Sequence, residues 1–115
     1  MHEKVELTPL ATAFREAYVE AFGHAPTDYK SRSIYDAILI AADAINRAGT
    51  TDAEKVVDAL ESTELLVTRG TARFGTEKGG PEYHHWMPPM LVIQWQDKEQ
   101  VVLYPPEAAT GKLKR

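Results

Sequence analysis

The spacing of the apolar residues changes near the middle of the chain, and this change limits the folds that the chain can adopt. Before about residue 62, apolar residues recur every three or four positions, as in amphipathic helices. Later, short β-forming runs stand between glycines and prolines, as in strands and turns. We therefore expect an α/β fold, or α+β as an isolated piece. It has three helices, then a short strand and a C-terminal antiparallel β-hairpin.

The first predicted helix begins at Thr8 and Pro9 and ends before Gly23. Thr8 can cap free backbone N–H groups, Pro9 suits the first helical position, and glycine suits the stop. Apolar residues follow at helical spacing, namely Leu10, Ala13, Phe14, Ala17, Tyr18, Ala21 and Phe22. This stripe predicts that one face of the helix packs on the core.

Two more helices complete the predicted helical part, which spans residues 8–62. The second runs from residue 31 or 33 to residue 48, before Gly49. Its apolar residues cover more than one stripe, so we expect burial on most of its sides. The third begins with a capping box in which Thr51 and Glu54 satisfy each other's backbone N–H groups, and it ends near residue 61.

The β part spans residues 65–106. It contains a short strand at 70–74 and a hairpin whose strands, 90–95 and 100–104, flank a polar turn. Pro105 and Pro106 end the hairpin, and residues 107–115 are expected to be a frayed basic tail. A lone two-stranded hairpin is marginal in water. Its apolar surface therefore predicts a partner, either a second copy of the chain or a missing part of a parent protein.

Length and charge exclude several classes of protein. The 115 residues suit a single domain covering 1–115. With 13 basic and 17 acidic residues, the net charge of -4 argues against nucleic-acid binding. Cysteine is absent, which excludes disulfides and thiolate sites. The first six residues are charged and lack the apolar stretch of a signal peptide. The chain is therefore expected either to work in the cytoplasm or to be a mature or truncated piece.

Two adjacent histidines, His84 and His85, are the first candidates for metal chemistry. On an extended segment they point to opposite faces, so they rarely hold one ion together. We therefore predict no metal site. A metal-assisted hydrolase that also uses His24 and Glu82 stays open as an alternative, which bound zinc would support.

No catalytic residue is predicted. The hydroxyls of Ser31, Ser33, Thr68 and Thr71 lie outside any nucleophile motif. Asp36 and Asp43 lie seven residues apart on one helix face, where paired carboxylates could do acid–base work. The simpler interpretation is a solvated edge, or caps for a neighbouring backbone.

Several motifs taken together resemble one known family. In order along the chain they are F-x-x-x-Y-x-x-x-F-G-x-x-P from Phe14, Y-D-A from Tyr35, A-I-x-x-A-G from Ala44, A-L at Ala59, the glycine-flanked strand at 70–74, Pro88-Pro89, V-x-Q-W from Val92 and Y-P at Tyr104. From Leu7 to Leu113 the chain resembles the C-terminal third of the solute-binding proteins of ABC importers, of the branched-chain amino acid (Leu/Ile/Val) type. Such proteins are much longer than this chain.

The resemblance implies a two-lobed α/β protein that closes on a small ligand, with the helices in one lobe and the hairpin in the other. It places Tyr29 and Lys30 beside the ligand, where Tyr29 could stack or lend its hydroxyl and Lys30 could meet a carboxylate. It implies no cofactor and no enzymatic activity.

The same resemblance implies a periplasmic location, and it implies ABC transporter membrane subunits as partners. The ligand, an amino acid or another small carboxylate, is expected to bind only together with the rest of the parent protein, because a cleft needs both walls. The alternative is a stand-alone α+β interaction module that forms a homodimer through its C-terminal hairpin.

Overall fold

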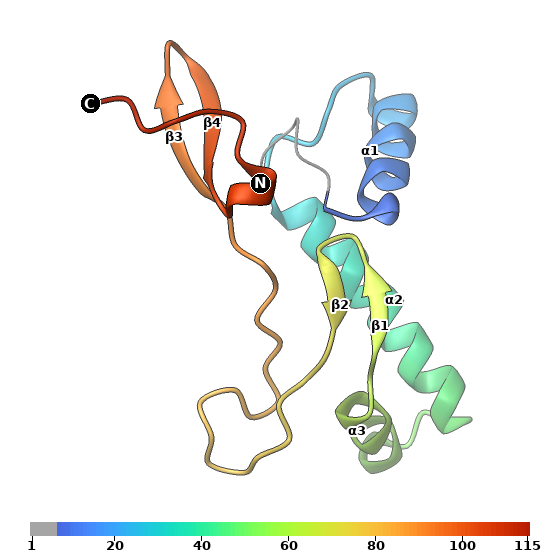
Figure 1. The fold of residues 1–115 in the computed structure, drawn as a ribbon. Helices are drawn as coiled ribbons and strands as arrows, with labels where there is room; N and C mark the ends of the chain where they lie inside the picture. Colours follow the sequence, from blue (N-terminus) through green and yellow to red (C-terminus); the bar gives the residue numbers. More distant parts are fainter. Residues whose placement is uncertain (1–6) are drawn as a thin grey trace.

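The computed structural model of the protein describes residues 7–115. Residues 1–6 form the charged start that lacks the apolar stretch of a signal peptide. They lie outside the described residues. In chain order the elements are α1 (Pro9–Phe22), α2 (Lys30–Ala48), α3 (Ala53–Glu61), β1 (Leu65–Val67), β2 (Gly70–Ala72), β3 (Val92–Gln96), β4 (Glu99–Tyr104) and the short 3-10 helix η1 (Pro106–Ala108). Strands β1 and β2 form one antiparallel pair and β3 and β4 another (Figure 1). The predicted α/β order is confirmed, and β1 is an addition to it.

Helix α1 begins and ends where the sequence predicts. The Thr8 hydroxyl oxygen accepts from the backbone N–H of Ala11 at 3.2 Å, and Gly23 ends the helix at a φ of 76°. The prediction that its apolar stripe faces the core is wrong. Phe14, Tyr18 and Phe22 form a row of mutually tilted rings with centroids 5.9 and 4.6 Å apart, and Phe22 is exposed. The start of α1 contacts the rest of the chain through Thr8 and the buried Ala11, and Phe14 packs on Tyr35 of α2 with ring centroids 5.0 Å apart.

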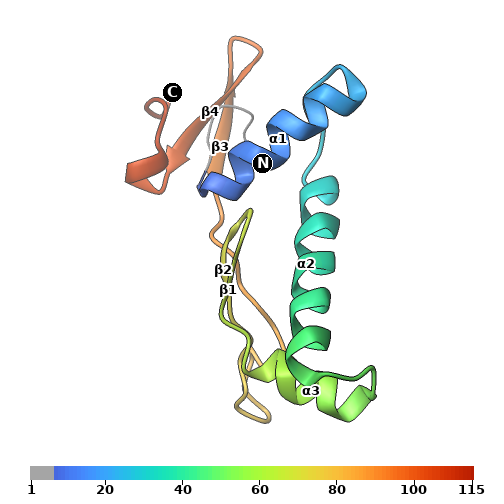
Figure 2. The same ribbon diagram turned by 90° about the vertical axis from the view of Figure 1, so that its right-hand side faces the viewer.

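Helix α2 begins one residue before the predicted range and is buried on one side only. The Asp28 carboxylate accepts from the backbone N–H of Lys30 at 2.8 Å and so starts the helix. The prediction of burial on most sides is wrong, since Ile34 and Ile38 are 61% and 63% exposed. Among the described residues, β1 and β2 lie along one side of α2 and no element covers the opposite side (Figure 2).

The core lies between α2, α3 and the β1–β2 pair. Its buried centre is Ile40, Val67 and Ala72, packed against Leu39, Leu60, Leu65, Phe74 and Trp86. The N-cap of α3 is Asp52, whose carboxylate accepts from the N–H of Lys55 at 3.2 Å. The predicted capping box at Thr51 is therefore wrong by one residue, because Asp caps a helix as well as Thr does.

The second hairpin turns at Asp97 and Lys98, whose φ values of 52° and 70° suit a tight two-residue turn. The prediction of a frayed tail is wrong. Gln94 donates to the carbonyl of Lys114 at 2.9 Å, and Gln96 donates to that of Lys112 at 2.8 Å. The tail therefore lies against β3, where its backbone satisfies two amide side chains.

The molecule is extended. Its radius of gyration is 16.7 Å, against about 13 Å for a compact domain of this length. The β3–β4 hairpin stands apart from the β1–β2 pair, and the segment 73–91 joins the two (Figure 1). The chain thus has a helical body with a small sheet, and a separate hairpin.

Candidate functional site

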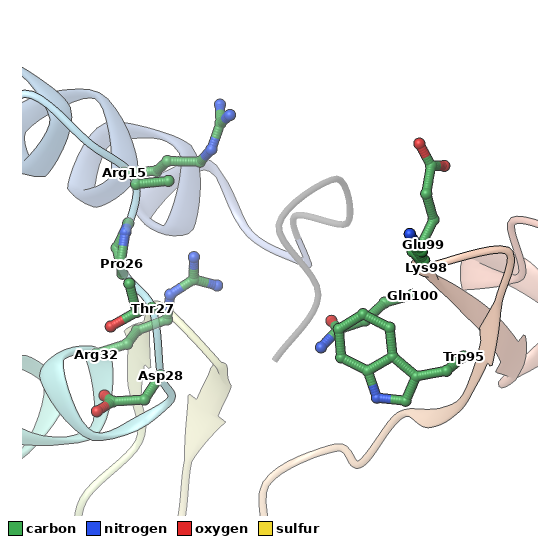
Figure 3. Close-up of a pocket in the computed structure, with 10 residues that line it drawn as sticks. Arg15, Pro26, Thr27, Asp28, Arg32, Trp95, Lys98, Glu99 and Gln100 are labelled. Carbon is green, nitrogen blue, oxygen red and sulfur yellow. The ribbon is translucent and has the colours of Figure 1, made fainter.

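A cavity of about 500 Å³ lies between the helical body and the hairpin (Figure 3). One wall comes from α1, the loop before α2 and the start of α2, and the other from the hairpin around its turn. The lining residues are Arg15, Ala25, Pro26, Thr27, Asp28, Arg32, Trp95, Lys98, Glu99 and Gln100. Trp95 projects from β3 toward the side that carries Arg32 and Asp28 (Figure 3). This arrangement makes a polar cleft with one aromatic face.

A second cavity of about 500 Å³ lies beside the first, and Arg32 lines both. Apolar side chains form much of its wall, and most of them come from the segment that leads into β3. The lining residues are Leu7, Tyr29, Arg32, Thr68, Arg69, Pro88, Pro89, Met90, Leu91 and Ile93. A mostly apolar cavity with a few polar groups on one side is the usual form of a small-molecule site. We call it the apolar cavity.

The two residues predicted to touch a ligand lie at the start of α2. Tyr29 lines the apolar cavity and is 59% exposed. Lys30 is exposed and lines neither cavity. The structure therefore brings Tyr29 to the apolar cavity and leaves Lys30 beside it, and the ligand roles of both residues stay predictions.

A buried carboxylate fixes the turn between β1 and β2 against α2. Asp36 is fully buried, and it accepts from the backbone N–H of Thr68 at 2.9 Å and from the Thr68 hydroxyl at 2.9 Å. The Arg69 Nε donates to the same carboxylate at 3.3 Å. These bonds hold Thr68 and Arg69 in the wall of the apolar cavity. Of the two interpretations that the sequence offers for Asp36, the structure shows the cap for a neighbouring backbone.

Two further contacts tie the same turn to its surroundings. The Thr8 hydroxyl lies 3.0 Å from the carbonyl oxygen of Val67 and 3.1 Å from that of Thr68, which joins the start of α1 to the turn. The guanidinium of Arg69 lies 5.1 Å from the centre of the Trp86 ring, which suits a cation–π contact. Arg69 is thus held on two sides, by a carboxylate and by a ring.

The cations of the apolar cavity are arginines. Arg32 is buried, with its guanidinium carbon 5.9 Å from the centre of the Phe14 ring, and Arg69 is fixed by Asp36. The planar guanidinium can bind a carboxylate through two parallel hydrogen bonds. Next to Tyr29 and Pro88–Leu91, these side chains suit a ligand with an apolar part and an acidic end. Sequence reasoning missed both arginines, although Arg32 follows Tyr29 by three positions and so lies near it on the helix surface.

Comparison with known proteins decides the family. The family model described as "Periplasmic binding protein" matches residues 3–100. The chain belongs to this family. The resemblance to solute-binding proteins that the motifs indicate is therefore confirmed at the level of the family.

The relatives among curated periplasmic binding proteins are longer than this chain. The chain is 28% identical over 107 residues to the Leu/Ile/Val-binding protein homolog 8 of Brucella melitensis, covering 93% of this chain and 26% of that protein. It is 27% identical over 107 residues to homolog 7 of the same organism, covering 93% and 27%. The chain thus spans about a quarter of the length of the curated relatives it matches.

Solved structures of periplasmic binding proteins share the fold. A leucine binding protein, LivK, from Thermotoga maritima matches with a TM-score of 0.73 at 24% identity, over 93% of this chain and 29% of that one. A putative branched-chain amino acid ABC transporter protein from Silicibacter pomeroyi matches with a TM-score of 0.68 at 24% identity, over 96% and 32%. The arrangement of helices and hairpins is therefore that of part of a periplasmic binding protein.

The histidines take no part in a metal site among residues 7–115, where no three His, Asp or Glu side chains gather to hold an ion. His84 Nε2 lies 2.6 Å from a carboxylate oxygen of Glu61, and the His84 ring stacks on Tyr83 at 3.9 Å. The alternative of a metal-assisted hydrolase gains no support from this placement. Within the same residues, none of the helices has the length and apolar character needed to cross a membrane.

Proposed function

We propose that this chain is part of an extracytoplasmic receptor that binds a branched-chain amino acid, or a related small carboxylate, for an ABC importer. Its relatives are named for binding Leu, Ile and Val, and the solved structures are titled as a leucine binding protein and a branched-chain amino acid ABC transporter. Binding is non-covalent and no bond of the ligand changes. The membrane subunits of an ABC transporter are its partners, and the periplasm is its location.

The apolar cavity is the observation that carries this proposal. Pro88, Pro89 and Leu91 supply a surface for an aliphatic side chain, and Tyr29 lies at the same cavity. Arg32 and Arg69 supply charge for a carboxylate. A branched-chain amino acid presents both features, an aliphatic group and a carboxylate.

Binding needs more than this chain. A cleft buries most of a small ligand only when it has two complete walls, and the chain spans 26% of a typical relative. In this proposal Tyr29 and Lys30 belong to the part of the wall that this chain supplies. Tyr29 lies against the aliphatic group, and Lys30 stands outside the cavity and attracts the carboxylate over a longer range.

The test uses two proteins, the chain itself and a fusion protein. In the fusion, the chain replaces the matched segment of the Brucella melitensis homolog 8. Thermal unfolding is followed with leucine, isoleucine and valine, and with lysine as a control ligand. At one hundred times the dissociation constant, a ligand adds about 2.7 kcal/mol of stability. We expect a shift of several degrees for the fusion with the three apolar amino acids and none for the isolated chain.

Variants of the fusion protein locate the ligand. Tyr29→Ala weakens the shift with leucine strongly and Lys30→Ala weakens it mildly, because only Tyr29 lies at the cavity. Exposed Glu54 lies on α3, away from both cavities, so Glu54→Ala is the matched control and leaves the shift unchanged. A folded fusion protein that shows no shift with any of the three amino acids contradicts the proposed function.

A further inference from the structure

Helix α2 turns Arg32 and Asp36 toward the rest of the chain and three of its four isoleucines to the outside. Its buried positions are Arg32, Asp36, Ile40 and Ala44. Ile34, Ile38 and Ile45 lie on the other side and are 61%, 63% and 37% exposed. A helix at a protein surface normally has the reverse polarity, with its apolar stripe inward. The outer face of α2 is therefore built for contact with something apolar.

The outer face is continuous. With 100° between successive residues, positions 34, 38, 41 and 45 fall on one narrow stripe, about 17 Å long at 1.5 Å per residue. From residue 34 to residue 45 this face carries only isoleucine and alanine, at Ile34, Ala37, Ile38, Ala41, Ala42 and Ile45. We call it the α2 stripe. Its alanines allow the backbone of a partner to approach closely.

Among residues 7–115 nothing covers the α2 stripe (Figure 2). Strands β1 and β2 and the segment that follows them lie on the opposite side of the helix. A contiguous apolar surface of this kind marks an interaction site in a protein that stays in solution.

We propose that the α2 stripe docks against the part of the periplasmic binding protein fold that this chain does not span, including when a separate polypeptide supplies that part. The match to the leucine binding protein covers 93% of this chain but only 29% of that protein, with a TM-score of 0.73. In that fold the same helix stands inside a protein more than three times as long. The docking partner presents an uncharged apolar surface, because a charge buried against isoleucine would lack a counterion.

A second copy of this chain fits the α2 stripe less well. A standard stable interface buries about 800 Å² on each partner, and three partly exposed isoleucines on one helix offer much less. The remainder of the fold can extend beyond the stripe to the exposed Phe22 and Trp95, so its interface with this chain is larger. This inference rests on family membership and on α2, and it does not depend on ligand binding.

The test joins the 115-residue chain with the remainder of the Brucella melitensis homolog 8, made as a separate polypeptide without its matched segment. The two are produced together and separated by size, and light scattering gives the mass of each species without added ligand. We expect a one-to-one complex. Ile38→Asp lowers the amount of complex by about tenfold or more. Asn46→Asp, an exposed position on α2 outside the stripe, changes it by less than about twofold.

A fusion of the same two parts into one polypeptide covers the case in which the separate remainder fails to fold. In the fusion, Ile38→Asp lowers the unfolding temperature by several degrees more than Asn46→Asp. Equal effects of the two substitutions overturn the inference. A homodimer of the chain alone that Ile38→Asp abolishes also overturns it, because the stripe would then bind its own copy. A separate remainder that folds but forms no complex with the chain also overturns the inference.

Discussion

Replacing Asp36 with alanine is expected to remove a large part of the stability of this chain. The carboxylate is fully buried, and it accepts three hydrogen bonds, at 2.9, 2.9 and 3.3 Å, from two groups of Thr68 and from Arg69. Asp36→Ala leaves the backbone N–H of Thr68 buried without an acceptor, which costs about 1–3 kcal/mol. It also leaves the Arg69 guanidinium without its counterion.

The two losses together cost about 3–5 kcal/mol, as is usual when one partner of a buried pair is removed. The Arg69 side chain is 30% exposed, so water recovers part of its loss and the lower half of that range is expected. A domain of this size has about 5–15 kcal/mol in total, so the variant unfolds at a much lower urea concentration.

Urea unfolding, followed by circular dichroism and by the fluorescence of Trp86 beside Arg69, measures this loss. Asp43→Ala is the matched control, since it is the same substitution on the same helix. Its carboxylate is 31% exposed and pairs with Arg47 at 2.8 Å, so its loss is about 0.3–0.5 kcal/mol. A loss of less than about 1 kcal/mol for Asp36→Ala, or one equal to that of the control, would refute the reasoning.

Three smaller effects follow from the caps and the tail. Asp52→Ala destabilises the chain by about 1 kcal/mol, while Thr51→Ala is nearly neutral. Urea unfolding compares the two variants. A lower midpoint for Thr51→Ala than for Asp52→Ala would place the cap of α3 at Thr51. Gly49→Ala costs about 1 kcal/mol, because Gly49 has a φ of 66°, at which a Cβ is strained. Thermal unfolding measures this loss, and Gly49→Asn, which tolerates a positive φ better, should lose less. Thr110→Val removes the hydroxyl that accepts from the Val102 N–H at 2.9 Å. Hydrogen exchange of that N–H should accelerate, and unchanged exchange would show that the tail does not protect it.

The element boundaries that depend on local chemistry could be read from the sequence. Thr8 starts α1, and Gly23 and Gly49 end α1 and α2, because capping needs only neighbouring backbone groups. Strand β1 could not be found in this way. It is three residues long, too short to show an alternating pattern, and its pairing with β2 gives it its structure.

The site was harder to predict than the fold. Tyr29 lines the apolar cavity because it immediately precedes a helix whose start is fixed by Asp28, and its role toward a ligand stays a prediction. Arg69 lies 33 positions after its partner Asp36, and no local pattern joins them. The buried face of α2 was misjudged for the same reason, since isoleucine and alanine predict burial only if the partner surface is part of the same chain.

The contacts of the helical body join residues farther apart in the sequence than those of the hairpin. This difference affects the order of folding. Thr8 bonds to backbone carbonyls 59 and 60 residues later, so α1 can dock only after more than half of the chain has been synthesised. In the hairpin, Gln94 reaches Lys114 over only 20 residues. Local contacts form faster than distant ones. During synthesis α1 therefore waits, with its row of aromatic rings exposed, until the turn at residues 67–68 has been made. The hairpin and its tail are made last and can close on themselves as soon as they emerge.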